Sequence, residues 1–88
     1  MNAVITVIGV DKVGILARIS TACAQAHVNI EEVTQTILRG MFAMIMLVTL
    51  PEDLTIESLS VKLNEAGEAL GVNVSVTRQE IYDVTHKV

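Results

Sequence analysis

Aromatic residues are almost absent from this chain, since Phe42 and Tyr82 are its only aromatic side chains and it has no tryptophan. Proteins that read single-stranded nucleic acids stack several bases on aromatic rings, and this chain lacks the rings to do so. Basic residues are also scarce: six Lys and Arg stand against ten Asp and Glu, and they are scattered along the sequence. A net charge of −4 repels phosphate backbones, so we expect no nucleic-acid partner.

Cysteine occurs once, as Cys23, which excludes an internal disulfide and a cysteine-rich zinc site. No Cys and His cluster has metal-ligand spacing, and neither a metal nor another cofactor is predicted.

Long hydrophobic runs are missing too, because the longest, Met41–Val48, is far too short to cross a bilayer. The N-terminus shows no signal-peptide pattern, since Asp11 and Lys12 soon follow its short apolar stretch. We therefore expect a cytoplasmic protein with no membrane partner.

Aliphatic residues are abundant. Hydrophobic residues make up 51% of the 88 residues, and nearly all are Val, Ile, Leu, Met and Ala. This content excludes a disordered chain, and the length suits one domain. We assign residues 1–80 to that domain and residues 81–88 to a C-terminal tail. A domain of this size builds only a small core, so part of the aliphatic surface needs other cover.

The hydrophobic period changes several times along the chain. Residues 3–8 and 41–50 are nearly continuous apolar runs, which predict strands buried on both faces. Residues 28–39 and 72–78 carry more polar side chains in alternation, as edge strands do. Amphipathic helices are predicted over 14–27 and 56–70, the second capped by Thr55 and ended by Gly71. Arg39 and Gly40 form the turn of a hairpin.

The predicted elements follow the order βαββαβ, which is that of a split βαβ sandwich. Central strands need cover on both faces, so residues 3–8 and 41–50 are expected to be neighbours in the middle of the sheet. Right-handed crossovers then give strand order 4-1-3-2 with both helices on one face. The fold class is thus α+β, a ferredoxin-like sandwich with an antiparallel sheet. Its other face is apolar and uncovered, and we interpret it as the contact surface of a homodimer or higher oligomer.

The loop from Gly9 to Gly14 joins a central strand to the first helix. Its backbone N–H groups, with the helix dipole behind them, favour a carboxylate or a phosphate. The alternative is a tight connection in which Gly14 only permits the backbone angle. The loop pattern alone leaves both interpretations open.

At this loop the sequence resembles the ACT domain family. The resemblance rests on residues 7–16 (VIGVDKVGIL), which match the family's pattern of Asp, two residues, Gly, a small apolar residue and Leu, and it continues with Ile19 and Val28-Asn29-Ile30. It covers residues 4–78, so the chain looks like a standalone single ACT domain. ACT domains typically bind amino acids or similar small ligands between two domains and regulate an attached enzyme or repressor.

The resemblance implies a set of ligand-binding residues. Gly14 would lie where the loop backbone approaches the ligand, Asp11 where the ligand's amino group is met, and Asn29 would help from the neighbouring domain. A helix N-terminus suits an α-carboxylate, and Asp11 with Asn29 suits an α-ammonium group. The full implied set is Asp11, Lys12, Val13, Gly14, Ile15, Leu16, Asn29 and Ile30.

The implied function is a non-enzymatic regulatory module that binds a small molecule, an amino acid by this resemblance, as a homo-oligomer. One alternative is a pure oligomerisation or interaction domain that acts in trans on an enzyme or regulator. Another is an acylphosphatase-like hydrolase, which has a similar length and element order. That chemistry needs an arginine at the first loop–helix junction, whereas Arg18 falls a full turn inside the helix. We therefore expect no catalytic residues.

Overall fold

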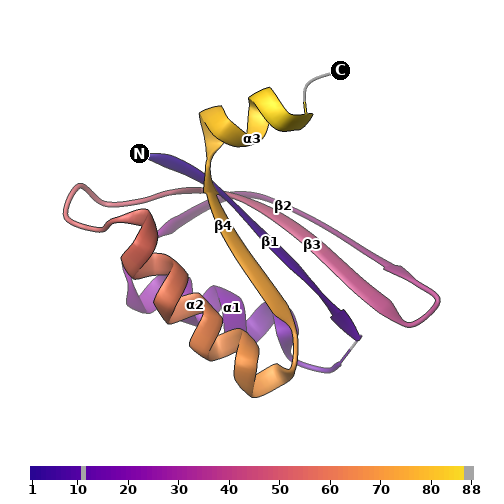
Figure 1. Cartoon of the computed structure of the whole chain (residues 1–88). Helices are drawn as coiled ribbons and strands as arrows, with labels where there is room; N and C mark the ends of the chain where they lie inside the picture. The colour runs from indigo at the N-terminus through magenta and orange to yellow at the C-terminus, as the bar shows by residue number, and fades with distance from the viewer. Residues whose placement is uncertain (11, 87–88) are drawn as a thin grey trace.

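A four-stranded antiparallel sheet with two helices on one face organises the chain (Figure 1). The computed structural model describes residues 1–10 and 12–86, and within this part the side chains up to Asp83. The elements are β1 (Asn2–Val10), α1 (Ile15–Gln25), β2 (Asn29–Leu38), β3 (Met41–Thr49), α2 (Ile56–Leu70), β4 (Asn73–Arg78) and α3 (Gln79–His86). The strand order is β2-β3-β1-β4, so the predicted ferredoxin-like sandwich with order 4-1-3-2 is confirmed.

The hydrophobic core lies between the sheet and the helices α1 and α2. From the sequence, either phase of residues 41–50 could face the helices. The structure turns Phe42, Met44, Met46 and Val48 toward them, and all four are buried. Their partners on β1 in the same layer are Ala3, Ile5 and Val7, which are fully buried. The helices contribute Ile15, Ile19, Cys23, Leu59 and Leu63.

Cys23 is a buried core residue, as its place on the apolar stripe of the first helix predicts. Burial disfavours the charged thiolate and raises the pKa of the Cys23 thiol to about 11. The thiol is therefore protonated at neutral pH and packs as a small apolar group.

Both core helices end in the same backbone motif. The N–H of Val28 donates to the carbonyl of Cys23 at 2.9 Å, and the N–H of Val72 donates to that of Gly67 at 3.0 Å. The left-handed residue is Gly71 in α2, as predicted, but His27 in α1, with φ 60°. The prediction of a helix through His27 is therefore wrong: α1 ends at Gln25, because His27 turns the chain into β2.

The N-terminus of α2 is capped as predicted. The hydroxyl of Thr55 accepts a hydrogen bond from the N–H of Ser58 at 3.0 Å. The hairpin turn is also confirmed, since Arg39 and Gly40 both have positive φ, 52° and 78°. Figure 1 shows that the hairpin of β2 and β3 projects beyond the helix layer. Most of β2 is consequently exposed.

A third helix, α3, occupies residues for which the sequence pattern predicted no helix, namely the last two residues of the assigned domain and most of the C-terminal tail. It follows β4 directly and contacts β1 and β4 on the sheet face opposite α1 and α2 (Figure 1). Val4 lies on that face and is only 1% exposed, although it does not belong to the core cluster. We conclude that α3 covers Val4 and with it one end of the outer sheet face. None of the described helices is long and apolar enough to span a membrane.

Candidate functional site

The loop between β1 and α1 presents an open helix N-terminus. Gly14 is the N-cap residue, with φ 91° and ψ 5°, and the first backbone bond of the helix runs from the N–H of Arg18 to the carbonyl of Gly14 at 2.9 Å. The N–H groups of the turn between them have no partner inside the helix. Within the described residues no side chain caps α1, and its first turn holds no acidic residue. These donors and the positive end of the helix dipole suit an anion.

A shallow hollow of about 400 Å³ adjoins this helix start and is lined by Val13, Gly14, Ala17, Arg18, Thr21 and Leu70. A Cβ built on Gly14 would meet no atom of the described residues within 4 Å. Glycine is therefore required at this position for its positive φ, and the space in front of it is open. Hydrogen bonds from backbone N–H groups and a guanidinium favour a carboxylate, so the hollow has suitable chemistry for one.

Arg18 is a residue that sequence reasoning missed as part of this site. Its position one turn inside the helix counts against a phosphate-cradling role at the loop junction. The same spacing places it four residues after Gly14, however, and residues four apart lie on the same side of a helix. The four-residue spacing between Gly14 and Arg18 was therefore the sequence signal that could have indicated Arg18 as part of this site.

The structure separates the roles of the other predicted loop residues. Val13 is fully exposed and Leu16 is 39% exposed, so both side chains are accessible. Ile15 is 1% exposed, and its side chain belongs to the core. The ammonium of Lys12 lies 3.3 Å from the position of a Cβ built on Gly71, which places it at the C-terminal end of α2. Asp11 lies outside the described residues.

Asn29 and Ile30 lie at the opposite end of the sheet from the loop. Asn29 pairs with Thr49, which pairs with Asn2 at the start of β1, whereas the loop follows the end of β1. One chain therefore does not bring Asn29 to Gly14. The resemblance implied a contribution from a neighbouring domain, and this geometry is compatible with that arrangement. Ile30 packs against the core.

A small hydrogen-bond network holds the Asn29 side chain. Its Nδ2 donates to Oε1 of Glu31 at 2.8 Å, and the hydroxyl of Thr49 donates to the same oxygen at 2.9 Å. Glu31 lies at an irregularity in the pairing of β2 with β3, between Ile30 and Glu32. Because the amide nitrogen of Asn29 is engaged, its Oδ1 is the atom oriented to accept a further hydrogen bond.

No metal centre is formed by the described residues, among which no three His, Cys, Asp or Glu side chains are grouped to hold an ion. A second surface groove, of about 580 Å³, runs between α1 and α2. Arg18 and Thr21 line both this groove and the hollow beside Gly14. The polar groups at the helix surface are therefore continuous with the loop.

The sequence and the fold have clear relatives. Residues 2–77 match the sequence profile of the ACT domain. The UPF0237 protein MK1213 of Methanopyrus kandleri is 48% identical over 88 residues, covering 99% of this chain and 98% of the relative. The UPF0237 protein YjhC of Lactococcus lactis is 39% identical over the full length of both chains. An ACT domain protein from Streptococcus pneumoniae has a similar structure, with a TM-score of 0.84, 32% identity and 94% of each chain covered. The chain therefore belongs to the ACT domain family.

Proposed function

We propose that this chain is a non-catalytic regulatory module of the cytoplasm that binds an amino acid as a homo-oligomer. Membership of the ACT family supports the coarser part, since ACT domains commonly serve as regulatory small-molecule-binding modules. The open N-terminus of α1 carries the finer part. Its N–H groups have no partner among the described residues, and these residues leave the front of Gly14 open. Together with the guanidinium of Arg18, these N–H groups offer donors to one α-carboxylate.

The α-ammonium group of the ligand needs acceptors, which we assign to Asp11 and to Asn29 of a second copy. Oδ1 of Asn29 is suited to this role, because its amide nitrogen is already bonded to Glu31. A ligand held by both copies would bind only the assembled form. Ligand binding and assembly are then coupled, which is how such a module would regulate an enzyme or regulator in trans.

A second candidate is a pure oligomerisation or interaction domain without a ligand. The observation in its favour is the outer sheet face, where Ile8, Val10 and Met41 are about half exposed. This candidate predicts assembly that no amino acid changes. A ligand screen therefore separates the two functions.

The first test is thermal unfolding in the presence of each of the twenty amino acids at millimolar concentration. A ligand at 100 times its Kd stabilises the folded protein by about 2.7 kcal/mol, which raises the Tm of a small domain by several degrees. We expect this shift with at least one amino acid. If none of them raises the Tm, the amino-acid ligand is ruled out and the interaction domain is favoured.

Gly14→Asp is the variant that tests the carboxylate position. It places a negative charge in front of the donors, so we expect it to abolish the ligand-induced shift. Gly14→Asn is the matched control, because it has the same size and tolerates positive φ but carries no charge. We expect Gly14→Asn to retain part of the shift. Equal loss in both variants would mean that bulk or strain at residue 14, rather than charge, prevents binding.

A further inference from the structure

The outer sheet face is turned away from α1 and α2, and the part of the chain that the structure describes covers it at one end only. The cross-strand register assigns Val4, Ile8 and Val10 of β1 to this face, together with Met41, Ile45 and Leu47 of β3 and Leu38 of β2. Val4 is buried at the end where α3 lies. The other end remains bare and forms the hairpin patch, which we define as Ile8, Val10, Leu38, Met41 and Ile45, each between 38% and 70% exposed.

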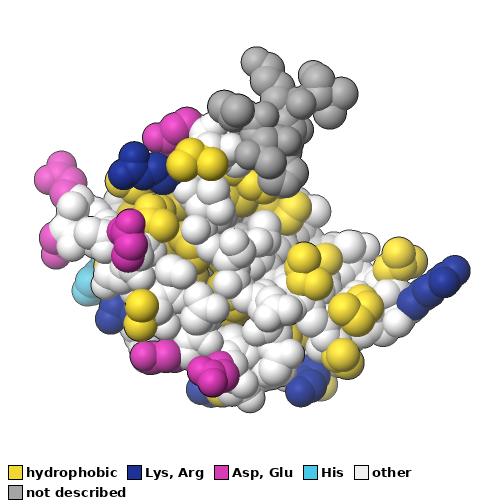
Figure 2. Space-filling view, viewed as in Figure 1, with side chains coloured by type: hydrophobic (Ala, Val, Ile, Leu, Met, Phe, Trp, Pro, Cys, Tyr) yellow, Lys and Arg dark blue, Asp and Glu magenta, His cyan; other side chains and the backbone are white. Residues whose placement is uncertain are grey.

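The hairpin patch is large for a protein of this size. Its five exposed side chains amount to roughly 500 Å² of apolar surface, which is near the upper end for monomeric proteins. A stable interface needs about 800 Å² from each partner. The patch supplies more than half of that area. The eight-residue helix α3 of the same chain would supply the rest by packing on the partner. Figure 2 shows hydrophobic side chains along the hairpin, ending at a basic residue.

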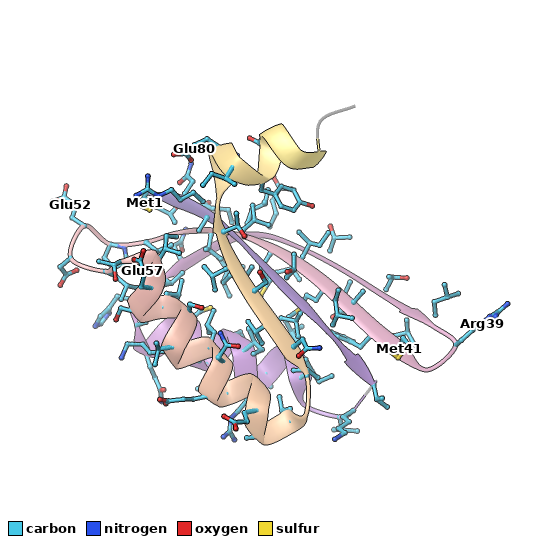
Figure 3. The ribbon with its side chains drawn as sticks, in the orientation of Figure 1. Met1, Arg39, Met41, Glu52, Glu57 and Glu80 are labelled. Carbon is cyan, nitrogen blue, oxygen red and sulfur yellow. The ribbon has the colours of Figure 1, made fainter. Side chains whose placement is uncertain are left out.

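Charged side chains lie at both ends of the outer face. Arg39 lies at the tip of the hairpin, beside Met41 of the patch, and Glu80 lies on α3 at the far end of the molecule (Figure 3). The charged side chains described on α3 are those of Glu80 and Asp83, and both are exposed. The covered end is thus raised and carries the carboxylates of Glu80 and Asp83, with the N-terminus of Met1 and the exposed Arg78 nearby, whereas the bare end is apolar with Arg39 at its rim.

From this arrangement we propose that a second copy of the chain covers the hairpin patch, with its α3 seated on the patch and its Glu80 and Asp83 next to Arg39. The proposal rests on the homo-oligomer of the proposed function and adds to it a contact between outer sheet faces. This contact lies on the other side of the sheet from the hollow beside Gly14, so it is separate from the ligand contact assigned to Asn29 of a second copy. A two-fold axis parallel to the sheets and across the strands brings the raised end of each copy onto the bare end of the other. Such a contact is isologous, so it closes at two copies.

The dimensions of the elements agree with this packing. β1 has nine residues and is therefore about 30 Å long, whereas a helix is about 10 Å across. Two copies of α3 fit side by side along the strands, one on each half of the gap between the facing sheets. Each α3 then contacts its own sheet on one side and the partner's hairpin patch on the other. Both copies thereby lose their exposed apolar face.

Charge reversal tests the pairing of Arg39 with α3. We expect Arg39→Glu alone, and Glu80→Arg with Asp83→Arg alone, each to raise the dimer dissociation constant in sedimentation roughly tenfold or more. Combining all three reversals should restore dimerisation, because the opposite charges face each other again. Lys62→Glu is the control, since it reverses one charge on α2 in the helix layer and should leave the dissociation constant unchanged.

Cysteine cross-linking gives a second readout that does not depend on charge. Chains carrying Arg39→Cys are mixed with chains carrying Asp83→Cys, and the buried Cys23 of each stays unreactive. We expect mixed disulfide dimers under mild oxidation. A chain that is monomeric at all concentrations, a dimer indifferent to the reversals, or an absence of mixed cross-links would each overturn this interface.

The same samples separate this interface from the ligand proposal. A charge-dependent dimer that no amino acid stabilises would overturn the amino-acid ligand and leave the interface standing. Stabilisation by an amino acid in a dimer that ignores Arg39 and Glu80 would overturn the interface and leave the ligand standing.

Discussion

At the scale of single residues, Gly67 shows why a glycine occupies the interior of a helix. Glycine there costs about 1 kcal/mol relative to alanine by propensity alone. The structure gives the reason for it, because a Cβ at residue 67 would lie 2.6 Å from Cγ2 of Val74 and 3.1 Å from the carbonyl oxygen of Val72. The close packing of α2 on β4 therefore requires the missing side chain.

We predict that Gly67→Ala destabilises the protein by about 1–3 kcal/mol in urea unfolding, although alanine is the better helix former. The neighbouring variant Glu68→Ala lies on the exposed side of α2 and should change the free energy of unfolding by less than about 0.5 kcal/mol. A gain of stability in Gly67→Ala would show that β4 moves away at little cost.

At the scale of elements, the two core helices offer a natural comparison, because they end in the same motif with different residues. Gly71 takes the left-handed position after α2 without strain, whereas His27 takes it after α1 with a side chain that disfavours it. The difference is intrinsic to the backbone, so it can be tested without altering the core.

We expect His27→Gly to raise the free energy of unfolding by about 1 kcal/mol, because glycine relieves the strain of positive φ at this position. Gly71→Ala should lower it by a similar amount for the converse reason. Both effects are read from chemical denaturation at one pH. A loss of stability in His27→Gly would indicate that the imidazole makes a stabilising contact that outweighs its backbone cost.

At the scale of the whole molecule, the outer face divides into a part that is buried within one chain and a part that remains exposed. Val4 and Ile8 lie on the same strand and the same face, yet Val4 is 1% exposed and Ile8 is 51% exposed. The difference arises from α3, which covers the first and does not reach the second. Truncating Val4 therefore tests the contact with α3, whereas truncating Ile8 tests the proposed contact with a second copy.

Val4→Ala should lower the free energy of unfolding by about 2 kcal/mol at every protein concentration, because its burial is internal. Ile8→Ala should have little effect on dilute protein and a larger one at concentrations where the dimer forms, since dimerisation stabilises by mass action. Thermal unfolding over a dilution series distinguishes the two. An effect of Ile8→Ala that is independent of concentration would count against assembly through this face.

Much of the fold was predictable because its signals are local. The β-branched runs of the central strands, the Thr55 cap and the Gly71 stop depend on neighbours in the sequence, and each was confirmed. The end of α1 at Gln25 was not predictable, because it depends on a left-handed backbone at His27, and residues other than glycine seldom adopt that conformation. Arg18 was overlooked because its contribution depends on which side of α1 faces the loop hollow, and that depends on how the helix packs.

The sequence alone determined the order of strands and helices and the separation of central from edge strands. Both are encoded in hydrophobic period and turn chemistry, which act over a few residues. The tertiary structure alone decided three other features. These are which phase of β3 faces the core, how far Asn29 lies from Gly14 within one chain, and how α3 covers Val4. These features depend on contacts between segments far apart in sequence. Such contacts form only when the sheet and the helices pack together, and that packing decides which aliphatic side chains each element buries.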